Sequence, residues 1–280
     1  MLEKCRISGF ADEIDQDFDE QIRVLSELGQ KFLELRGADG IGVADLTVEK
    51  AAQLKEKMNA AGIGVSAIGS PIGKIGIRDA FEPHFESFRK IVELAHFFQT
   101  PYIRMFSFYL PGEEDPEKYR EEVFERMEKL VEYAERENVI LLHENEKGIY
   151  GAMADPCRKL FERFYGEHFQ GIFDFANFVQ CGQDTLEAYE MLEPYIRYFH
   201  VKDAIWENGE VVLPGQGDGN LREIFQRAAA NGYEGFLSLE PHLFHFQGFD
   251  QLEQGSCGKK EGNGAMAFRA AHSSLLKLLA

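Results

Sequence analysis

The sequence has few cysteines and lacks any long hydrophobic run. Its cysteines lie far apart without a CxxC pair, which argues against a disulfide framework or a cysteine zinc site and fits a reducing compartment. They are Cys5, Cys157, Cys181 and Cys257. Nowhere do about eighteen apolar residues follow one another, and the charged start of the chain lacks the apolar core of a signal peptide. We therefore expect a cytoplasmic protein with no membrane partner.

Basic residues are also scarce. The chain has 30 Lys+Arg against 48 Asp+Glu, a formal net charge of −18, and the basic residues are scattered along the sequence. Such a chain repels polyanions unless it carries a concentrated basic face. We therefore expect no nucleic-acid partner.

Short apolar runs alternate with longer segments of helical period along the whole chain. This alternation predicts repeated βα units and a parallel sheet. Residues 8–13, SGFADE, do not form the glycine-rich phosphate turn of an open doubly wound sheet. The expected class is therefore α/β, a (β/α)8 TIM barrel that forms a single domain over residues 1–280. Its eight strands are expected at residues 6–11, 32–36, 64–68, 102–106, 139–143, 170–173, 196–200 and 235–239.

Helical segments fill the gaps between these strands. The clearest covers residues 115–137, where Asp115 is suited to cap the first free N–H groups. Asn220 and Glu223 resemble a capping box at the start of a later helix. The last helix is expected at residues 265–279, with an apolar face turned inward.

One long glycine-rich loop, at about residues 243–264, precedes the last helix. A loop of this length is usually a lid, an oligomer contact or a disordered segment. A homo-oligomer is therefore left open.

The last four expected strands share a property at their carboxyl ends, where TIM barrels build their active sites. Each ends in a side chain that can bind a divalent metal: Glu144, Asp174, His200 and Glu240. Three converging carboxylates repel one another and are costly to desolvate without a cation. Three oxygen ligands and one imidazole nitrogen suit one divalent metal ion, and Mn²⁺, Mg²⁺, Co²⁺ and Zn²⁺ all fit this set.

Five short segments resemble a known family. They are LHEN (142–145), FDFAN (173–177), FHVKD (199–203), GQGD (215–218) and LSLEP (237–241). In order and placement they are similar to the xylose-isomerase-like TIM-barrel superfamily, particularly its sugar phosphate isomerase/epimerase branch. The resemblance implies one divalent ion held by Glu144, Asp174, His200 and Glu240, with Glu144 and Glu240 as the acid/base pair on opposite faces of the substrate.

The resemblance implies a metal-dependent isomerase or epimerase whose small-molecule substrate is a carbohydrate, a sugar or a sugar phosphate. A metal bound to a sugar carbonyl and its neighbouring hydroxyl polarises the C=O and stabilises an enediolate, while a carboxylate moves the proton. The chain departs from the family pattern at Asn177, where a substrate-binding His is common; Asn can hydrogen-bond but cannot titrate. Residues 204–207 also lack the Arg of ketose epimerases, and Glu146 replaces a His.

Further candidates for substrate binding flank these ligands. Lys202 and Asp203 follow His200 and either bind substrate hydroxyls or a metal-bound water, or form a partly exposed ion pair. Arg36 alternates with apolar residues in the second strand, as does Glu34, so that both either reach the mouth or pair with each other.

Two features, one after the eighth strand and one after the seventh, are open to more than one interpretation. His242, two residues beyond Glu240, either shuttles a proton or is simply solvated. The turn at residues 215–220 precedes a helix and either holds a phosphate or is a plain turn with an N-cap.

Other functions remain open on the same scaffold. A lyase, such as an inositol-type dehydratase or a C-glycoside-cleaving subunit, shares proton abstraction beside a carbonyl with an isomerase. An endonuclease-IV-like hydrolase is disfavoured by the −18 charge and by the lack of extra His ligands at strand ends. A non-catalytic sugar-binding barrel has no need of paired carboxylates.

Overall fold

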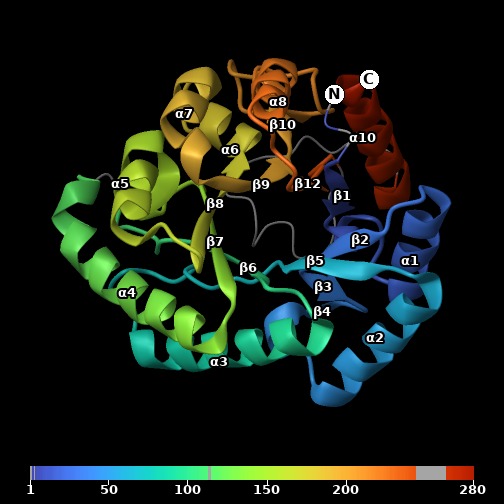
Figure 1. Cartoon of the computed structure of the whole chain (residues 1–280), viewed down its shortest axis with the longest axis horizontal. Helices are drawn as coiled ribbons and strands as arrows, with labels where there is room; N and C mark the ends of the chain where they lie inside the picture. The colour runs from blue at the N-terminus through green and yellow to red at the C-terminus, as the bar shows by residue number, and fades with distance from the viewer. Residues whose placement is uncertain (1, 3, 113–114, 244–262) are drawn as a thin grey trace.

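Eight parallel strands surround the centre of the computed structural model, which describes residues 2, 4–112, 115–243 and 263–280 (Figure 1). They lie in the order β1-β12-β9-β8-β7-β6-β5-β2. Their bounds are β1 Arg6–Gly9, β2 Phe32–Leu35, β5 Gly64–Ile68, β6 Tyr102–Met105, β7 Ile140–Glu144, β8 Phe169–Asp174, β9 Ile196–Val201 and β12 Phe236–Leu239. All eight expected strands are present, and no end differs from the expected one by more than two residues.

The eight strands form a nearly closed barrel, in which β1 has β12 on one side and β2 on the other. β1 pairs with β12 along its whole length. The gap between β1 and β2 is spanned by a bridge between Phe10 and Glu34. The expected TIM barrel is therefore confirmed.

Helices form a ring outside the strands (Figure 1). Each turns a buried apolar face toward the sheet, as the 3.6-residue pattern predicts. Their bounds are α1 Phe18–Glu27, α2 Val48–Ala61, α3 Phe81–Phe98, α4 Arg120–Glu137, α5 Ala154–Phe164, α6 Phe175–Gln180, α7 Thr185–Leu192, α8 Leu221–Ala230 and α10 Gly264–Leu279. No helix of the described part of the chain is both long and apolar enough to cross a membrane.

Two helix starts differ from expectation. The Asp115 carboxylate accepts the N–H of Glu117, but residues Pro116–Tyr119 form a 3₁₀ turn before α4 begins. The capping role expected of Asn220 is wrong. Its φ of 55° is left-handed, and its amide donates to Thr185 Oγ1 at 2.9 Å instead of capping α8.

Two short hairpins were not predicted, because each strand has only two residues. β3 (Gly37–Ala38) pairs with β4 (Ile41–Gly42) after β2, and β10 (Asp203–Ala204) pairs with β11 (Val211–Val212) after β9. Both lie at the carboxyl ends of barrel strands. The expected loop at 243–264 lies almost entirely outside the described residues.

The barrel interior changes in character along its axis. One layer is apolar and includes Leu142, Ile172 and Phe236. Tyr198 belongs to the same layer, but its hydroxyl lies 2.9 Å from Ser66 Oγ and donates to Glu34 Oε2 at 3.0 Å. These polar contacts connect the packed core to the residues at the mouth.

Candidate metal and active site

Four side chains meet at the mouth of the barrel. Glu144 and Asp174 end β7 and β8, His200 lies in β9 opposite Asp174, and Glu240 directly follows β12. All four are buried, and each offers a ligand atom within 4.8 Å of the others. The parallel register therefore brings together the residues that the strand-end pattern singled out.

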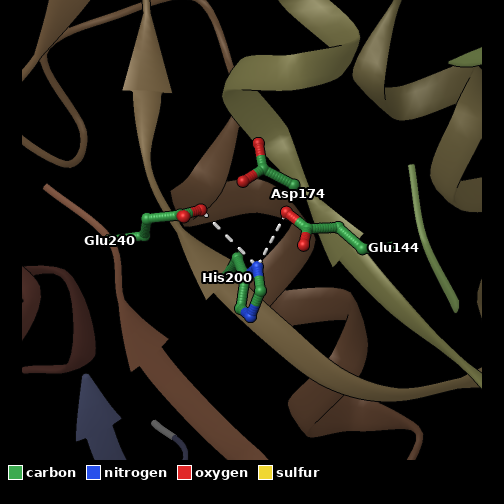
Figure 2. Close-up of side chains that lie close together, drawn as sticks. All are labelled: Glu144, Asp174, His200 and Glu240. Carbon is green, nitrogen blue, oxygen red and sulfur yellow. Dashed lines mark ion pairs between the residues drawn. The ribbon is translucent and has the colours of Figure 1, made fainter. Parts of the chain in front are cut away.

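The two glutamates approach the imidazole from opposite sides, and Asp174 lies across from it (Figure 2). His200 Nδ1 is 2.9 Å from Glu144 Oε1 and 3.6 Å from Glu240 Oε2. Asp174 Oδ1 accepts the N–H of Asn177 at 2.7 Å, because Asp174 caps α6. This cap fixes one carboxylate oxygen and leaves Oδ2 for the cluster.

The far side of the imidazole is held by Glu34. His200 Nε2 lies 3.1 Å from Glu34 Oε2, which also accepts hydrogen bonds from Tyr198 and from Ser238 Oγ at 2.7 Å. When Nε2 carries the proton and donates a hydrogen bond to Glu34, the lone pair of Nδ1 faces the carboxylates of Glu144 and Glu240. A carboxylate behind a histidine in this way is typical of metal sites. The sequence placed Glu34 inside the barrel but did not show this partner.

Burial and the neighbouring charged side chains shift the pKa values of the cluster. Burial raises the pKa of Asp174 to about 8. Burial also acts to raise the pKa of Glu240, but Lys202 and His242 outweigh it, so that this pKa lies well below its usual range. Burial acts to lower the pKa of His200, but Glu144 and Glu34 outweigh it, so that this pKa lies well above its usual range. The three carboxylates thus depend on positive charge placed among them.

The donor set fits a divalent metal ion. His200 Nδ1 and Asp174 Oδ2 are buried, and neither has an aligned hydrogen-bond partner among the residues that the structure describes. Buried polar atoms of this kind call for an explanation, and an ion bound between them supplies one. Three carboxylates and one imidazole suit Mg²⁺, Mn²⁺, Co²⁺ or Zn²⁺.

Arg36 reaches the mouth of the barrel, which is one of the two placements expected from the sequence. Its guanidinium donates to Asp12 at 2.8 and 3.1 Å, to Glu13 Oε1 at 3.2 Å and to Glu240 Oε1 at 3.1 Å. It does not pair with Glu34. Arg36 therefore fixes one side of Glu240.

His242 and Lys202 hold other parts of this site. His242 is buried rather than solvated, and its Nε2 lies 3.3 Å from Glu13 Oε1 and 3.4 Å from Glu240 Oε1. Its pKa is raised to about 9, because Glu13 and Glu240 outweigh the effect of burial. Lys202 Nζ lies 3.2 Å from Asp174 Oδ2 and 3.3 Å from Glu240 Oε2. The exposed Lys202–Asp203 pair is therefore absent.

Asn177 borders the site from α6. Its amide nitrogen donates to the Asn145 carbonyl at 2.9 Å and lies 3.4 Å from Glu144 Oε1. Asn145 in turn accepts the N–H of Asp174 through its side chain. These amides tie the ends of β7 and β8 together beside Glu144.

The Asp203 carboxylate binds the backbone of a nearby turn and not the open mouth of the barrel. Its Oδ2 accepts the N–H groups of Gly215 and Gly217 at 2.8 and 2.9 Å, and its Oδ1 accepts those of Gly219 and Ala204 at 3.0 Å. Burial raises the pKa of Asp203, and these donors act in the opposite direction. A carboxylate offers about four acceptor positions. All are filled by backbone, so the expectation that Asp203 binds substrate hydroxyls is corrected.

Sequence reasoning missed Arg104. It lies in β6, with Nη1 3.3 Å from Glu144 Oε2 and 3.8 Å from Glu240 Oε1, and Nη2 donates to the Gly69 carbonyl. The rings of Phe10 and Phe106 flank its guanidinium at about 5 Å. A charged residue inside the apolar run 102–106 was the available signal, the same one that drew attention to Arg36.

Glu13 was also missed, although it follows the first strand closely. With Glu240 and His242 it forms a second group of buried potential ligands. The Arg36 guanidinium contacts both glutamates of this group. Because Arg36 already supplies the positive charge that these carboxylates need, we assign no second metal there.

No curated protein matches the sequence of this chain. The probable 3-DHS dehydratase AsbF from Bacillus anthracis is similar in structure, at 18% identity and a TM-score of 0.74 over 97% of this chain and 98% of that one. An L-ribulose 3-epimerase has 16% identity and a TM-score of 0.75 over 98% and 94%.

A third solved structure is a xylose isomerase-like TIM barrel protein from Mycobacterium smegmatis in complex with magnesium. It has 17% identity and a TM-score of 0.68 over 99% of this chain and 97% of that one. At such identities the likeness shows a shared fold. The family model described as xylose isomerase-like TIM barrel matches residues 22–256. The chain therefore belongs to the xylose isomerase-like TIM barrel family.

Proposed function

We propose that this protein is a divalent-metal-dependent isomerase or epimerase that acts on a sugar or sugar derivative, with its catalytic domain spanning residues 1–280. The observation that carries the proposal is the pair of buried glutamates, Glu144 and Glu240, on opposite sides of His200 (Figure 2). The epimerase among the similar structures and the magnesium complex of another support it.

Glu144, Asp174, His200 and Glu240 would hold the ion. When bound, the ion would polarise a substrate carbonyl and stabilise the negative charge of an enediolate. Glu34 orients His200, and the Asp174 cap on α6 orients that carboxylate.

The two glutamates are the proposed acid/base pair. One carboxylate removes a proton from the carbon beside the carbonyl. Return of a proton to the opposite face of that carbon gives an epimer, and return to the neighbouring carbon gives an aldose–ketose isomer. Arg104 and Asn177 position Glu144.

The residues around these glutamates have proposed roles in substrate binding. Lys202 borders Asp174 and Glu240, and Arg36 and His242 contact Glu240. Together with Asn177, they would bind substrate hydroxyls as the sugar lies between the glutamates.

Exchange of a substrate C–H with deuterated water tests the acid/base pair. Incubation with Mg²⁺ or Mn²⁺ and a panel of ketoses, followed by NMR, should show exchange that a chelator abolishes. Glu144→Gln and Glu240→Gln should each slow exchange by about 10²- to 10⁴-fold. Glu135→Gln, at an exposed position on α4, is the control and should leave the rate unchanged.

Two results would contradict this assignment. Undiminished exchange in both glutamate variants would remove their acid/base roles, and full turnover in excess chelator would remove the metal. Net loss of water or of an aglycone would instead identify a lyase, the reaction type named for the dehydratase of similar fold.

A further inference from the structure

Lys202 lies among the residues that would hold the ion, two positions after His200. It directly follows β9 and is only 2% exposed. Its ammonium nitrogen, Nζ, lies 3.2 Å from Asp174 Oδ2 and 3.3 Å from Glu240 Oε2. Because a buried ammonium group needs anionic partners, these two contacts hold the Lys202 side chain in the site.

The two oxygens that Lys202 contacts are the ones that remain for an ion. Asp174 Oδ1 already accepts the N–H of Asn177 at 2.7 Å. Glu240 Oε1 accepts a hydrogen bond from Arg36 at 3.1 Å. This leaves Asp174 Oδ2 and Glu240 Oε2 as the oxygens that would face the ion. The ammonium group and a divalent cation therefore depend on the same two atoms.

The two arginines at the mouth are held differently. Arg36 donates to Asp12 at 2.8 and 3.1 Å, and it reaches Glu240 through Oε1. Arg104 Nη2 donates to the Gly69 carbonyl at 3.2 Å. Both guanidinium groups are therefore fixed by partners outside the four potential ligands.

The Lys202 ammonium can move without a change in the barrel. It is a compact charge on a flexible four-carbon stem. A divalent ion placed against Asp174 Oδ2 and Glu240 Oε2 repels this ammonium, and burial leaves the repulsion weakly screened. Since an ion of charge +2 attracts the two carboxylates more strongly than a single charge does, the ammonium is the group that yields.

We propose that Lys202 is a tethered cation that holds Asp174 Oδ2 and Glu240 Oε2 until a divalent ion binds, and that it then yields both oxygens to the ion and turns toward the substrate. This inference rests on the proposed function and adds a coupling to it, because metal binding releases a substrate-binding group. Lys202 thereby stabilises the metal-free protein and weakens its affinity for the metal.

Calorimetric titration of metal-stripped protein with Mn²⁺ tests the competition without any substrate. Lys202→Met keeps an unbranched apolar stem and removes the charge, so its Kd for Mn²⁺ should be at least about 10-fold lower than that of the wild type. Lys74→Met is the matched control, since Lys74 pairs at 3.0 Å with Glu146, which is not one of the four potential ligands. A gain in affinity in Lys202→Met no larger than that in Lys74→Met would overturn the inference.

Melting temperatures separate this role from a purely structural one. Metal-free Lys202→Met should melt lower than the metal-free wild type, because the buried Glu240 loses one of its cations, and saturating Mn²⁺ should close most of the difference. A difference in Tm that Mn²⁺ leaves unchanged would contradict the exchange of cations.

Crystals of the wild type grown with and without Mn²⁺ decide if the variant does not fold. With Mn²⁺ bound, Lys202 Nζ should lie beyond hydrogen-bond distance of Asp174 Oδ2 and Glu240 Oε2, and retention of both contacts would overturn the inference.

Failure of the inference and failure of the proposed function are distinguishable. Metal-dependent deuterium exchange in the wild type, together with an unchanged Mn²⁺ affinity in Lys202→Met, would overturn the inference and leave the proposed function intact. Absence of Mn²⁺ binding to the wild type would count against the proposed function and, with it, the inference.

Discussion

Asp174 and Asp203 are both fully buried carboxylates at the ends of neighbouring strands, but the chain satisfies them very differently. Asp203 accepts four backbone N–H groups, which fill its acceptor positions. Asp174 accepts one, and its Oδ2 lies 3.2 Å from Lys202 Nζ as an ion pair, without an aligned hydrogen bond within the described residues. The comparison indicates that a buried acid saturated by its own backbone maintains the fold, whereas one left incomplete is available to bind a ligand.

The largest effect should come from removing the saturated acid. Asp203→Ala leaves four N–H groups without their acceptor, and we expect it to destabilise the fold by about 3 kcal/mol or more. In a protein of this size that lowers Tm by roughly 5–10 °C, measured by differential scanning calorimetry.

Asp174→Asn is the matched comparison. It replaces a carboxylate whose pKa burial raises to about 8 by a neutral amide of similar shape, so the metal-free protein should melt no lower than the wild type. The rise in Tm with Mg²⁺ or Mn²⁺ should disappear. If Asp174→Asn melted lower than Asp203→Ala in the absence of metal, the distinction between the two acids would fail.

A smaller effect is expected at Glu34, which contacts His200 on the side of the imidazole that faces away from the other three ligands. Glu34→Gln removes the charge that orients His200, and metal affinity should fall about 10- to 100-fold by calorimetric titration. Ser66→Ala is the control, since Ser66 belongs to the same interior network through Tyr198 but does not touch the imidazole. Equal losses in the two variants would show that Glu34 acts through packing alone.

The smallest effect near neutral pH is expected at His84, whose Nε2 accepts the Gly73 N–H at 2.7 Å. Burial, with help from Arg126, lowers the pKa of His84 to about 4 from an ordinary value of 6.5. The unfolded chain therefore binds more protons between these values, so stability should fall as pH drops from about 6.5 to 4. His84→Gln keeps an acceptor without titrating. In melting curves across this range, it should show a shallower pH dependence than the wild type, and an identical slope would contradict this account.

The eight strands and four strand-end ligands could be predicted because they depend on local pattern. Apolar runs fixed the strands, and the residue that ends each run necessarily lies at the mouth of a parallel barrel. Glu144 and Glu240 required no knowledge of their neighbours to be placed there.

Other residues have roles that depend on partners distant in sequence. The neighbours of Arg104 include Glu240, and those of Asp203 include Gly219. Asn220 matched a helix-capping pattern, yet a left-handed backbone turned its amide toward Thr185. No sequence pattern at these positions reveals such contacts, because tertiary packing decides them.

The pairing of β1 with β12 has a consequence for folding during synthesis. Arg6 pairs with Phe236, so nearly the whole chain must leave the ribosome before the barrel can close. Until then, the edge of β1 that pairs with β12 has no partner strand. Glu240, the last of the four ligands, follows the closing strand directly. A nascent chain halted before residue 236 therefore has only three of the four ligands, and the site is completed in the same step that closes the barrel.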